Sequence, residues 1–452
     1  MARRYDRRSI LKGTAAGITI TLAGCLGDDG GDDGDDGDGG DADGGNGNVT
    51  DGDGDGTTDG DGGDGDGSDI PGSESGRTVS VGVLQPVTGD LGDLGAPIRD
   101  AAILPGSQLE GETDFEIDIR DEDTESTPEA GVSAAESLSN AGYPAVTGAA
   151  SSAVTQNVAQ SVFIPNGIVG CSPASTSPAI TNLDDDDLIF RTAPSDALQG
   201  EVMAQVAYES RDLTSAAVFH LNNEYGELLS ESFAGAFEEL GGTVQTQTAF
   251  EAEQPSYTSA LDSTLSDDPD LLVVIGYPAS GTQIFRDYYA DFDAERTVMV
   301  TDGLQSSDLP GNVDNPMSNV LGTAPLASGP NVDAFNQLYE DEYDRAPGVF
   351  NAQAYDATAI LLLANVAAGE NDGLAIRDQM RTVANPEGME VGPSNLAEGI
   401  ATVAGGEEVN YQGASSPVTF DENGDVVAVT YSIWEFGDGG AIEQIETVEF
   451  GP

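Results

Sequence analysis

Residues 145–152 read Ala-Val-Thr-Gly-Ala-Ala-Ser-Ser, and residues 168–178 read Ile-Val-Gly-Cys-Ser-Pro-Ala-Ser-Thr-Ser-Pro. Each stretch is a short apolar run that ends in small hydroxyl residues and leads into an amphipathic segment. Short apolar runs that alternate with longer amphipathic stretches are typical of βα units, in which helices connect parallel strands. The two stretches therefore predict parallel strands whose carboxyl ends carry loops rich in side-chain donors.

The same alternation runs through most of the chain after Thr78. The predicted strands are residues 79–84, 115–119, 145–148, 168–171, 215–220, 244–250, 271–275 and 298–301. Helical spacing of apolar residues predicts helices over 197–208 and 224–240, a proline predicts the first turn of another at Pro128, and 352–368 is a buried helix too short to cross a bilayer.

After Gly405 the pattern changes to strands and turns. Residues 417–420, 426–436 and 442–450 predict a hairpin with a further strand, and Asn423-Gly424 is expected to supply the positive φ angles of its turn. The predicted fold class is α/β, with two lobes that are each a mainly parallel sheet flanked by helices. The crevice at the carboxyl ends of such strands is where open sheets bind ligands.

The amino terminus has the features of an export signal. Arg7-Arg8 precedes fifteen uncharged residues from Gly13 to Gly27, fewer than the roughly 20 that a spanning helix needs. The arginine pair resembles a twin-arginine signal, and Leu22-Ala23-Gly24-Cys25 resembles a lipobox, which implies cleavage before Cys25 and a lipid on its thiol. The alternative is a cleaved signal with a chance cysteine. We predict a twin-arginine signal and lipobox in residues 1–25.

Residues 26–77 predict a disordered tether. Between Asp28 and Asp69 the chain is almost entirely Asp and Gly, so charge repulsion and the entropy of glycine both oppose a packed core. Residues 51–56 imitate the start of a calcium loop, but Gly62 stands where its bidentate Glu is expected. We interpret the segment as a spacer.

Acidic residues also dominate the body of the chain. From Thr78 onward there are 62 acidic residues and nine arginines, and the single lysine, Lys12, lies in the predicted signal. Such self-repulsion strains a compact fold at ordinary ionic strength, whereas molar salt shortens the screening length to about 3 Å. The composition resembles the proteins of extreme halophiles, particularly halophilic archaea. It argues against nucleic acid or an acidic membrane surface as a partner.

Few side chains are available for catalysis or metal binding. The chain has two cysteines, Cys25 and Cys171, and one histidine, His220. With Cys25 assigned to the lipid, no disulfide or thiolate metal site is expected within one chain. A nucleophilic Cys171 would need His220 as its base, so a small buried Cys171 and a structural His220 are the simpler interpretation. We predict no enzyme, no metal and no cofactor.

Seven motifs in order resemble the branched-chain amino-acid-binding family of ABC-transporter substrate-binding proteins, which has a type I periplasmic-binding-protein fold. Each motif is weak alone; they are residues 81–89 with Leu94-Gly95, 148–152, 167–178, 190–192, 223–226, 276–278 and 301–303. The resemblance covers nearly all of residues 78–450 and implies two lobes joined by three crossovers. It implies an N-terminal lobe of residues 78–193 and 326–411 and a C-terminal lobe of residues 194–325 and 412–450.

The hydroxyl loops of the first lobe form one predicted half of a ligand site. A hydroxyl-rich loop that enters a helix offers unpaired N–H groups and side-chain O–H groups, and the helix dipole there favours an anion. Ser151, Ser152 and Thr176 each precede an amphipathic segment, so helix capping is their alternative role. The resemblance implies that Ser151 or Ser152 binds the ligand's α-carboxylate together with Ala174, Ser175 and Thr176, with Ala174 offering only its backbone.

The second lobe supplies the other predicted half. Asp302 follows an apolar strand and precedes a glycine, so it either faces the crevice or bonds to its own backbone as a turn residue. Tyr225 and Tyr277 either offer hydroxyls and ring faces to a cation or pack at the base of a loop. The resemblance implies that Asp302 binds the α-ammonium, where relatives commonly have Glu. It also implies that Leu94, where relatives often have an aromatic residue, alters side-chain specificity.

The predicted function is that of an extracellular lipoprotein that captures a branched-chain or similar amino acid and delivers it to an ABC importer. The expected partners are a small-molecule ligand, the permease and ATPase subunits, and the membrane through the lipid on Cys25. We expect a monomer at the cell surface, anchored to the outer face of the cytoplasmic membrane. The alternatives are a binding protein for an amide, urea or aromatic acid, and a ligand-sensing surface receptor with the same fold.

Overall fold

The computed structural model describes residues 3–5, 76–292, 294–385 and 387–451. Apart from Arg3–Tyr5, the predicted signal lies outside the described residues, as do Cys25, where we predict a lipid, and nearly all of the predicted tether. Within the described part, no single helix is long and apolar enough to cross a membrane. Only α13 (Asn351–Ala368) and α14 (Gly373–Ala384) taken together reach that length and composition, and the chain bends by 113° between them.

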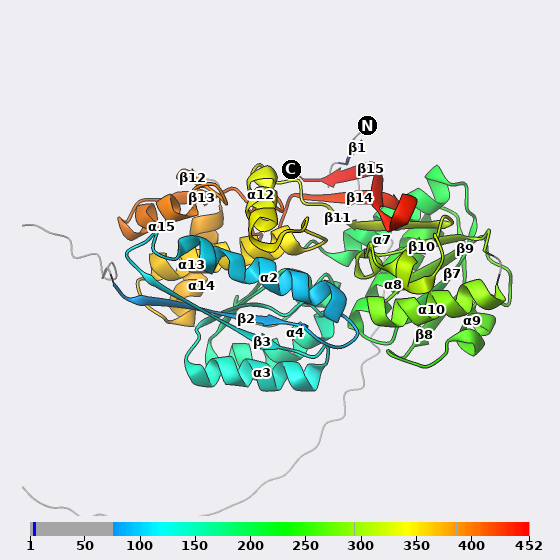
Figure 1. The fold of residues 1–452 in the computed structure, drawn as a ribbon, viewed down its shortest axis with the longest axis horizontal. Helices are drawn as coiled ribbons and strands as arrows, with labels where there is room; N and C mark the ends of the chain where they lie inside the picture. Colours follow the sequence, from blue (N-terminus) through cyan, green and yellow to red (C-terminus); the bar gives the residue numbers. More distant parts are fainter. Residues whose placement is uncertain (1–2, 6–75, 293, 386, 452) are drawn as a thin grey trace, which may run out of the picture. The chain divides into compact units, whose positions relative to one another are not determined.

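The first lobe is built on a five-stranded parallel sheet with the order β3-β2-β4-β5-β6. Its strands are β2 (Thr78–Gln85), β3 (Glu116–Asp123), β4 (Ala145–Gly148), β5 (Val169–Ser172) and β6 (Ile189–Arg191). The helices between them are α2 (Gly92–Leu109), α3 (Pro128–Ala141), α4 (Ser152–Val158) continued by η1 (Ala159–Phe163) and α5 (Ile164–Asn166), and α6 (Pro178–Thr181). Figure 1 shows α3 and α4 on one face of this sheet and α2, α13 and α14 on the other.

Later segments of the chain complete the first lobe. Helix α13 is buried along nearly its whole length and packs against α2, β2 and β4, as its apolar sequence predicts. Tyr343, at the end of α12 (Val332–Tyr343), donates a hydrogen bond to the carbonyl of Asp100 in α2. Beyond α14, a two-stranded parallel sheet pairs β12 (Met389–Val391) with β13 (Val409–Tyr411), and α15 (Leu396–Ala404) packs beside it.

The second lobe is built on an eight-stranded sheet with the order β1-β15-β14-β11-β10-β9-β7-β8. All its pairs are parallel except those that β14 makes with β11 and β15. The strands are β1 (Arg3–Tyr5), β7 (Ser215–Leu221), β8 (Thr243–Phe250), β9 (Leu271–Ile275), β10 (Thr297–Val300), β11 (Val320–Pro325), β14 (Val429–Phe436) and β15 (Ile442–Phe450). The helices are α7 (Asp196–Gln205) continued by η2 (Val206–Ser210), α8 (Glu224–Glu239), α9 (Thr258–Thr264), α10 (Pro278–Asp291), η3 (Asp302–Leu304), α11 (Leu309–Val313) and η4 (Asp438–Gly440).

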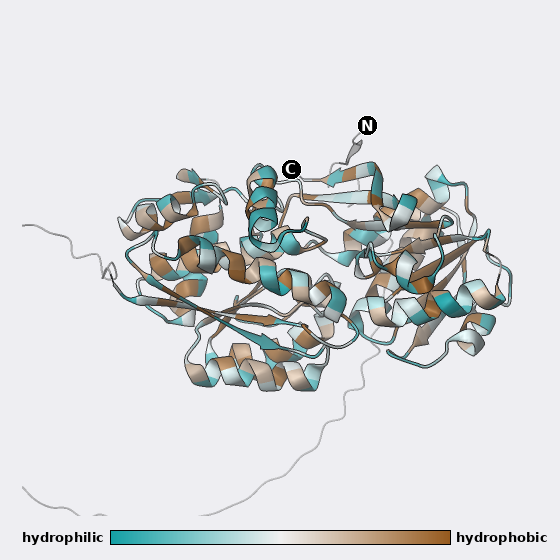
Figure 2. Cartoon of the chain, viewed as in Figure 1, coloured by the Kyte–Doolittle hydropathy of each residue, from teal (hydrophilic) through white to brown (hydrophobic). Residues whose placement is uncertain are grey.

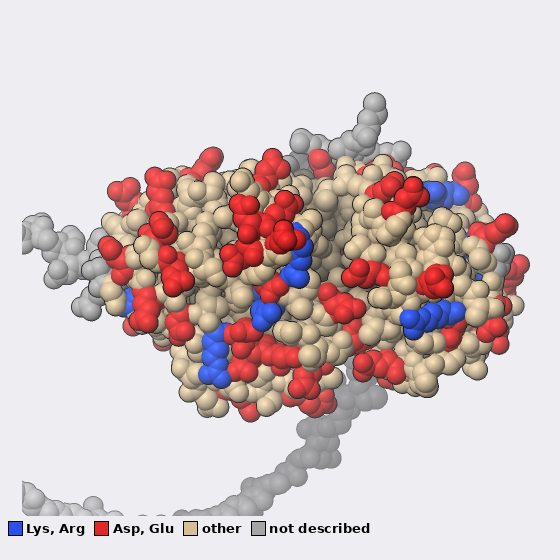
Figure 3. Space-filling model, viewed as in Figure 1, with Lys and Arg blue, Asp and Glu red and all other residues tan. Residues whose placement is uncertain are grey.

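The predicted strands and helices of the two sheets are confirmed to within a few residues. Strand β9 is buried at every position, which explains its uninterrupted apolar run, whereas the edge strand β8 keeps exposed polar residues. In Figure 2 the apolar colour follows the inner strands and α13, while α12 is mostly hydrophilic. Acidic side chains are spread over the face of the molecule in Figure 3, with few basic ones among them, as the composition predicts.

The prediction for residues 417–436 needs a correction. Strands β14 and β15 form the hairpin, but residues 417–420 are not its partner strand and contribute a single bridge from Phe420 to Val426. The turn at Asp421 exists, and its side chain accepts hydrogen bonds from the backbone of Asn423 and Asp425. Gly424 has a φ of 76°, whereas Asn423 does not have a positive φ, because the Asp421 side chain organises this turn.

Candidate functional site

A pocket lies where the carboxyl ends of the strands in both sheets meet. Its lining consists of Leu91, Leu94, Ile98, Ala150, Ser152, Ala174, Tyr225, Tyr277, Asp302, Gly303 and Phe350. It encloses about 310 Å³ of empty space, the part open to solvent included. A larger hollow lies at the amino ends of β4 and β5, beside Pro144 and Leu374, but none of the predicted site residues lines it. Convergent polar groups among apolar walls make the first pocket the candidate site.

Six of the nine predicted ligand residues line this pocket, and three lie just behind it. The lining residues are Leu94, Ser152, Ala174, Tyr225, Tyr277 and Asp302. Ser151, Ser175 and Thr176 are buried but are not among the lining residues. The structure therefore brings both predicted halves of the site together, with part of the hydroxyl loops turned inward.

The serines of the first loop are not ordinary helix caps. Ser151 is the N-cap residue of α4, but its side chain makes no capping hydrogen bond. The hydroxyl of Ser152 accepts a hydrogen bond from the backbone N–H of Ser177 at 3.3 Å, which connects the two loops. The capping role that the sequence left open is thus filled in the second loop by Ser177, whose hydroxyl accepts the N–H of Ala179.

Ser175 and Thr176 use their hydroxyls inside the protein. The Ser175 hydroxyl donates to the carbonyls of Ala149 and Ala150 at 3.0 and 3.1 Å. The Thr176 hydroxyl donates to the Asp196 carboxylate at 2.9 Å, and the Asp196 backbone N–H donates to the Thr176 carbonyl at 2.8 Å. These bonds fix the backbone of the second hydroxyl loop at the edge of the pocket.

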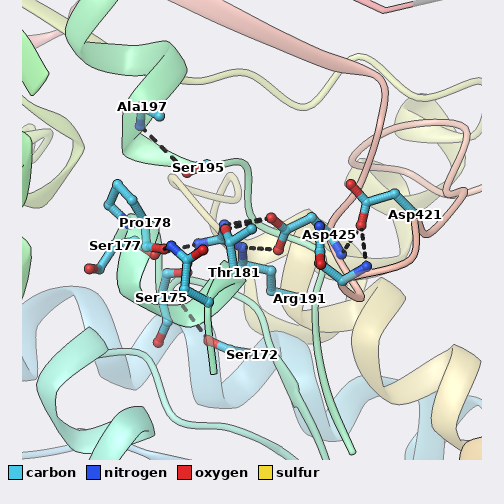
Figure 4. A network of polar contacts seen from close by, with 12 residues as sticks. Ser172, Ser175, Ser177, Pro178, Thr181, Arg191, Ser195, Ala197, Asp421 and Asp425 are labelled. Carbon is cyan, nitrogen blue, oxygen red and sulfur yellow. Dashed lines mark hydrogen bonds and ion pairs between the residues drawn. The ribbon is translucent and has the colours of Figure 1, made fainter. Parts of the chain in front are cut away.

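A buried arginine anchors the same loop from behind (Figure 4). The Arg191 guanidinium donates to the carbonyls of Ser175 and Ser177 at 3.1 and 2.9 Å, on either side of Thr176. It also pairs with Asp425 through two hydrogen bonds of 2.5 and 2.8 Å. A planar guanidinium suits such a fork. Because Asp425 lies between Phe420 and β14, Arg191 ties the hydroxyl loop to the segment that leads into β14.

The second lobe presents a buried carboxylate to the pocket. Asp302 is only 3% exposed, and its carboxylate accepts a hydrogen bond from the Gln199 amide at 2.7 Å and longer ones of 3.4 Å from the Tyr225 hydroxyl. Burial raises the pKa of Asp302 to about 6, although these hydrogen bonds oppose the shift. A role as a turn residue therefore does not account for all the contacts of Asp302, because its side chain also bonds to distant residues at the pocket wall.

A second carboxylate lies behind Asp302. Asp196 is fully buried, and its pKa is raised well above the usual value by burial and by the charge of Asp302. One carboxylate oxygen of Asp196 and the amide oxygen of Gln199 are buried without a hydrogen-bond partner among the described residues. This wall therefore holds more acceptors than donors, so a cationic group is the complementary ligand chemistry.

Two aromatic rings complete the second wall. Tyr225 and Tyr277 stack with ring centroids 5.6 Å apart and planes 6° from parallel. Tyr277 is hydrogen-bonded to Ser151 of the first wall and to Asn223 of the second, so it joins the two walls. Burial raises the pKa of Tyr277, and these two hydrogen bonds partly offset that rise. Gly303 lies against the Gly276 carbonyl so closely that a Cβ atom would come within 2.4 Å of that oxygen. A side chain at Gly303 would therefore push this wall out of place.

Several residues of the site were not predicted from the sequence. Phe350 lies at the pocket with a φ of 64°, a left-handed conformation that is strained for a bulky residue and tends to occur at ligand sites. Leu91 and Ile98 add to the apolar lining. Asp196 and Gln199 lie three positions apart on one face of α7, and this spacing was the available signal for them.

The side chains considered for catalysis lie apart from this constellation. Cys171 is fully buried with a raised pKa, so it is poorly suited to act as a thiolate nucleophile. Burial lowers the pKa of His220, whose ring contacts the carbonyl of Leu221. Among the described residues, no three His, Cys, Asp or Glu side chains are grouped as metal ligands.

Comparison with known sequences gives consistent matches over the same range. A sequence model of the periplasmic binding protein family matches residues 78–430. The chain is 26% identical over 393 residues to the chemotactic signal transduction system substrate-binding protein BasB of Halobacterium salinarum, covering 83% of this chain and 91% of BasB. It is 24% identical over 310 residues to a leucine-, isoleucine-, valine-, threonine- and alanine-binding protein of Pseudomonas aeruginosa, covering 67% and 82% of the two chains.

Solved structures share the architecture. A leucine-binding protein of Thermotoga maritima has a TM-score of 0.70 at 24% identity, covering 83% of this chain and 99% of that one. A solute-binding protein of R. palustris in complex with benzoate has a TM-score of 0.65 at 18% identity, covering 82% and 96%. These likenesses confirm the predicted two-lobed α/β fold.

Proposed function

This chain belongs to the periplasmic binding protein family, and on that basis we propose that it is an exported lipoprotein that delivers an amino acid to an ABC importer. The ligand is a branched-chain or similar amino acid, held between the lobes. The observation that carries the proposal is the convergence, on one pocket, of a hydroxyl-lined wall at Ser152 and a buried carboxylate at Asp302.

The two polar walls suit the two charges of a zwitterion. In this proposal Ser152 and the backbone of Ala174 form the α-carboxylate end at the pocket wall, and Ser151, Ser175 and Thr176 support it from behind. Asp302 receives the α-ammonium, with Asp196 behind it and the Tyr225 hydroxyl beside it. Hydrogen bonds to charged groups contribute about 1.5–3 kcal/mol each, so four or five of them, less the free energy of closing, leave roughly 8 kcal/mol, which is micromolar binding.

The remaining lining suits an aliphatic side chain. Leu91, Leu94, Ile98 and Phe350 supply apolar surface from the first lobe and the start of α13. Removing such surface from water contributes about 25 cal/mol per Å², so these residues favour leucine-like ligands over glycine or alanine. Because the ligand touches both lobes, it binds the closed state better and shifts the population toward closure.

The amino-terminal segment supports surface attachment. Arg7-Arg8 and the lipobox ending in Cys25 support export and a lipid anchor at the outer face of the membrane, and residues 26–77 then serve as the tether. The lobe boundaries predicted above, residues 78–193 with 326–411 and residues 194–325 with 412–450, remain part of the proposal. Delivery to a permease requires no chemical step, so we propose a monomeric binding protein rather than an enzyme.

Two observations favour alternatives within the same fold. BasB is a substrate-binding protein of a chemotactic signal transduction system, so ligand sensing is the second candidate function. A structural relative binds benzoate, so an aromatic acid is the second candidate ligand. An aromatic acid has no ammonium and would leave the Asp302 wall without its complementary charge.

A ligand screen tests the proposal directly. Thermal-shift measurements on the full chain in several molar KCl should compare amino acids, simple amides, urea and benzoates. We expect leucine, isoleucine or valine to raise the melting temperature, as binding to the folded state requires. Stabilisation by benzoate, urea or an amide while every amino acid fails would refute the amino-acid proposal. Pull-down of a permease rather than a receptor would then separate transport from sensing.

A further inference from the structure

Asp90 joins the two walls of the cleft without a ligand. It lies in the loop between β2 and α2, and its carboxylate accepts hydrogen bonds from the backbone N–H and the hydroxyl of Ser280 at 2.7 and 2.8 Å. Its carbonyl also accepts the N–H of Ala279 at 3.4 Å. Ser280 belongs to the first turn of α10, so the contact runs from the first sheet's loop to the second sheet's helix.

Helix α10 depends on this contact for its cap. Its N-cap residue, Tyr277, makes no side-chain capping hydrogen bond, and Pro278 fills the first helical position. The first N–H groups of a helix have no partner within the helix, and the positive end of its dipole favours a carboxylate. Asp90 therefore provides, from the other lobe, the cap that most helices receive from their own N-cap residue.

The loop that carries Asp90 is fixed on its own lobe. The Ser126 hydroxyl donates to the Thr88 carbonyl at 2.8 Å and accepts the Leu91 N–H at 3.1 Å, on either side of Asp90. The Thr88 hydroxyl donates to Asp123 at 2.7 Å. The carboxylate is thus presented by a rigid loop, and Leu91, the next residue, already lines the pocket.

We propose that Asp90 is a latch between the lobes, which caps α10 only when the cleft is closed. The inference rests on the proposed function, because it takes the cleft to open for ligand exchange. In an open form, water would hydrate Asp90 and the first turn of α10 separately. The latch therefore stabilises the closed form even without a ligand, and it slows the release of a bound ligand.

Burial limits the strength of this latch. Asp90 is 6% exposed, and its second carboxylate oxygen is buried with no hydrogen-bond partner among the described residues. Burial raises its pKa, the hydrogen bonds from Ser280 oppose that shift, and the charge of Glu253 adds to it. Desolvation thus offsets part of the gain, so the closed state is favoured without being locked.

Substitution of Asp90 tests the latch. Asp90→Ala and Asp90→Asn should be compared with Asp93→Asn, which removes the same charge from an exposed position three residues away. We expect the Asp90 variants to release a bound amino acid about tenfold faster with little change in association rate, as for loss of a charge-assisted hydrogen bond. In ligand-free full chain, small-angle scattering should show a larger radius of gyration. Asp93→Asn should match the wild type in both measurements.

The outcomes separate this inference from the proposed function. Unchanged release rates and an unchanged radius of gyration in both Asp90 variants would overturn the latch while leaving amino-acid binding intact. If the wild type binds no amino acid, the proposed function fails, and the ligand-free scattering comparison still decides whether Asp90 holds the lobes together. Asp90→Asn keeps the side-chain shape, so this variant can test the latch if Asp90→Ala does not fold.

Discussion

Two buried carboxylates in this protein have similar pKa values and very different surroundings. Burial raises the pKa of both Asp302 and Asp356 to about 6. Asp356, on α13, accepts four hydrogen bonds from residues 411–415, given by the Tyr411 hydroxyl, the Ala414 N–H, and the N–H and hydroxyl of Ser415. Asp302 accepts one short bond, from Gln199, and faces the pocket.

The difference shows that burial and a raised pKa do not by themselves identify a functional carboxylate. The chain supplies Asp356 with a full set of donors, so this residue holds residues 411–415 in place. Asp302 accepts one short hydrogen bond, from Gln199, and longer ones from Tyr225, and its charge raises the pKa of a second carboxylate, Asp196. The carboxylate that lines a cavity, with a second carboxylate behind it, is the one available to a ligand.

Truncation at Asp356 should have the largest effect on stability. Asp356→Ala leaves four buried donors without their acceptor, so we expect a loss of about 3 kcal/mol in the free energy of unfolding. Denaturant unfolding in several molar KCl measures it, and Asp356→Asn, which retains one acceptor oxygen, should lose less. Ligand affinity of the remaining folded protein should be unchanged. An affinity loss comparable to that of Asp302→Asn would contradict a purely structural role for Asp356.

Asp302→Asn should have the opposite profile. Loss of the carboxylate should weaken amino-acid binding by about 1.5–3 kcal/mol, measured by isothermal titration. The free energy of unfolding should stay the same or rise, because a buried charge next to Asp196 is removed. Asp308→Asn, an exposed carboxylate in the same loop, is the matched control and should bind like the wild type. If Asp302→Asn binds the amino acid as tightly as the wild type, Asp302 is a turn residue and not a ligand contact.

The pH dependence should separate binding from stability. The ligand's ammonium prefers the ionised Asp302, so affinity should rise as the pH increases through about 6 and then level off. Folding favours the neutral form of both carboxyls, whose ordinary pKa is 3.8, so their contribution to stability is greatest below that value and declines as the pH rises through about 6. Titration calorimetry and melting at pH 5 to 8 measure the two trends. Asp302→Asn should remove the rise of affinity with pH. An affinity that still rises with pH in this variant would contradict the assignment of the ammonium site to Asp302.

Leu94→Ala should give the smallest change. Leu94 is partly exposed and lines the apolar part of the pocket, so its truncation should weaken leucine binding by about 1 kcal/mol. Alanine binding, which does not reach that surface, should be little affected. Competition titration with the two amino acids measures the difference. An equal loss of affinity for leucine and alanine would instead place Leu94 against the α-carbon part that the two ligands share.

Local sequence patterns predicted most strands of the two sheets and the approximate place of the site, but they missed β6, β11 and the β12–β13 pair. Strand β9 is predicted at its exact bounds because every residue is buried, and the hydroxyl loops follow β4 and β5 as the quoted stretches predict. The 417–420 strand was wrong because the Asp421 side chain and the Arg191–Asp425 pair organise that segment. Alternating apolar residues carry no information about such contacts.

The details of the site depend on contacts between distant parts of the chain. Gln199 meets Asp302 across 103 positions, and Asp90 meets Ser280 across 190. The sequence analysis assigned Thr176 either a capping or a ligand-binding role, yet its hydroxyl donates to Asp196, which the sequence analysis did not predict. Tertiary packing decides which donors remain free for a ligand, and that packing cannot be derived from spacing.

The most direct test is titration of leucine into the wild type and Asp302→Asn in several molar KCl at pH 7.5. We predict micromolar or tighter binding to the wild type, at least tenfold weaker binding to the variant, and a melting temperature of the ligand-free variant that is unchanged or higher. Equal affinities for the two proteins, or binding of benzoate in place of any amino acid, would contradict a cleft that recognises the ammonium through Asp302.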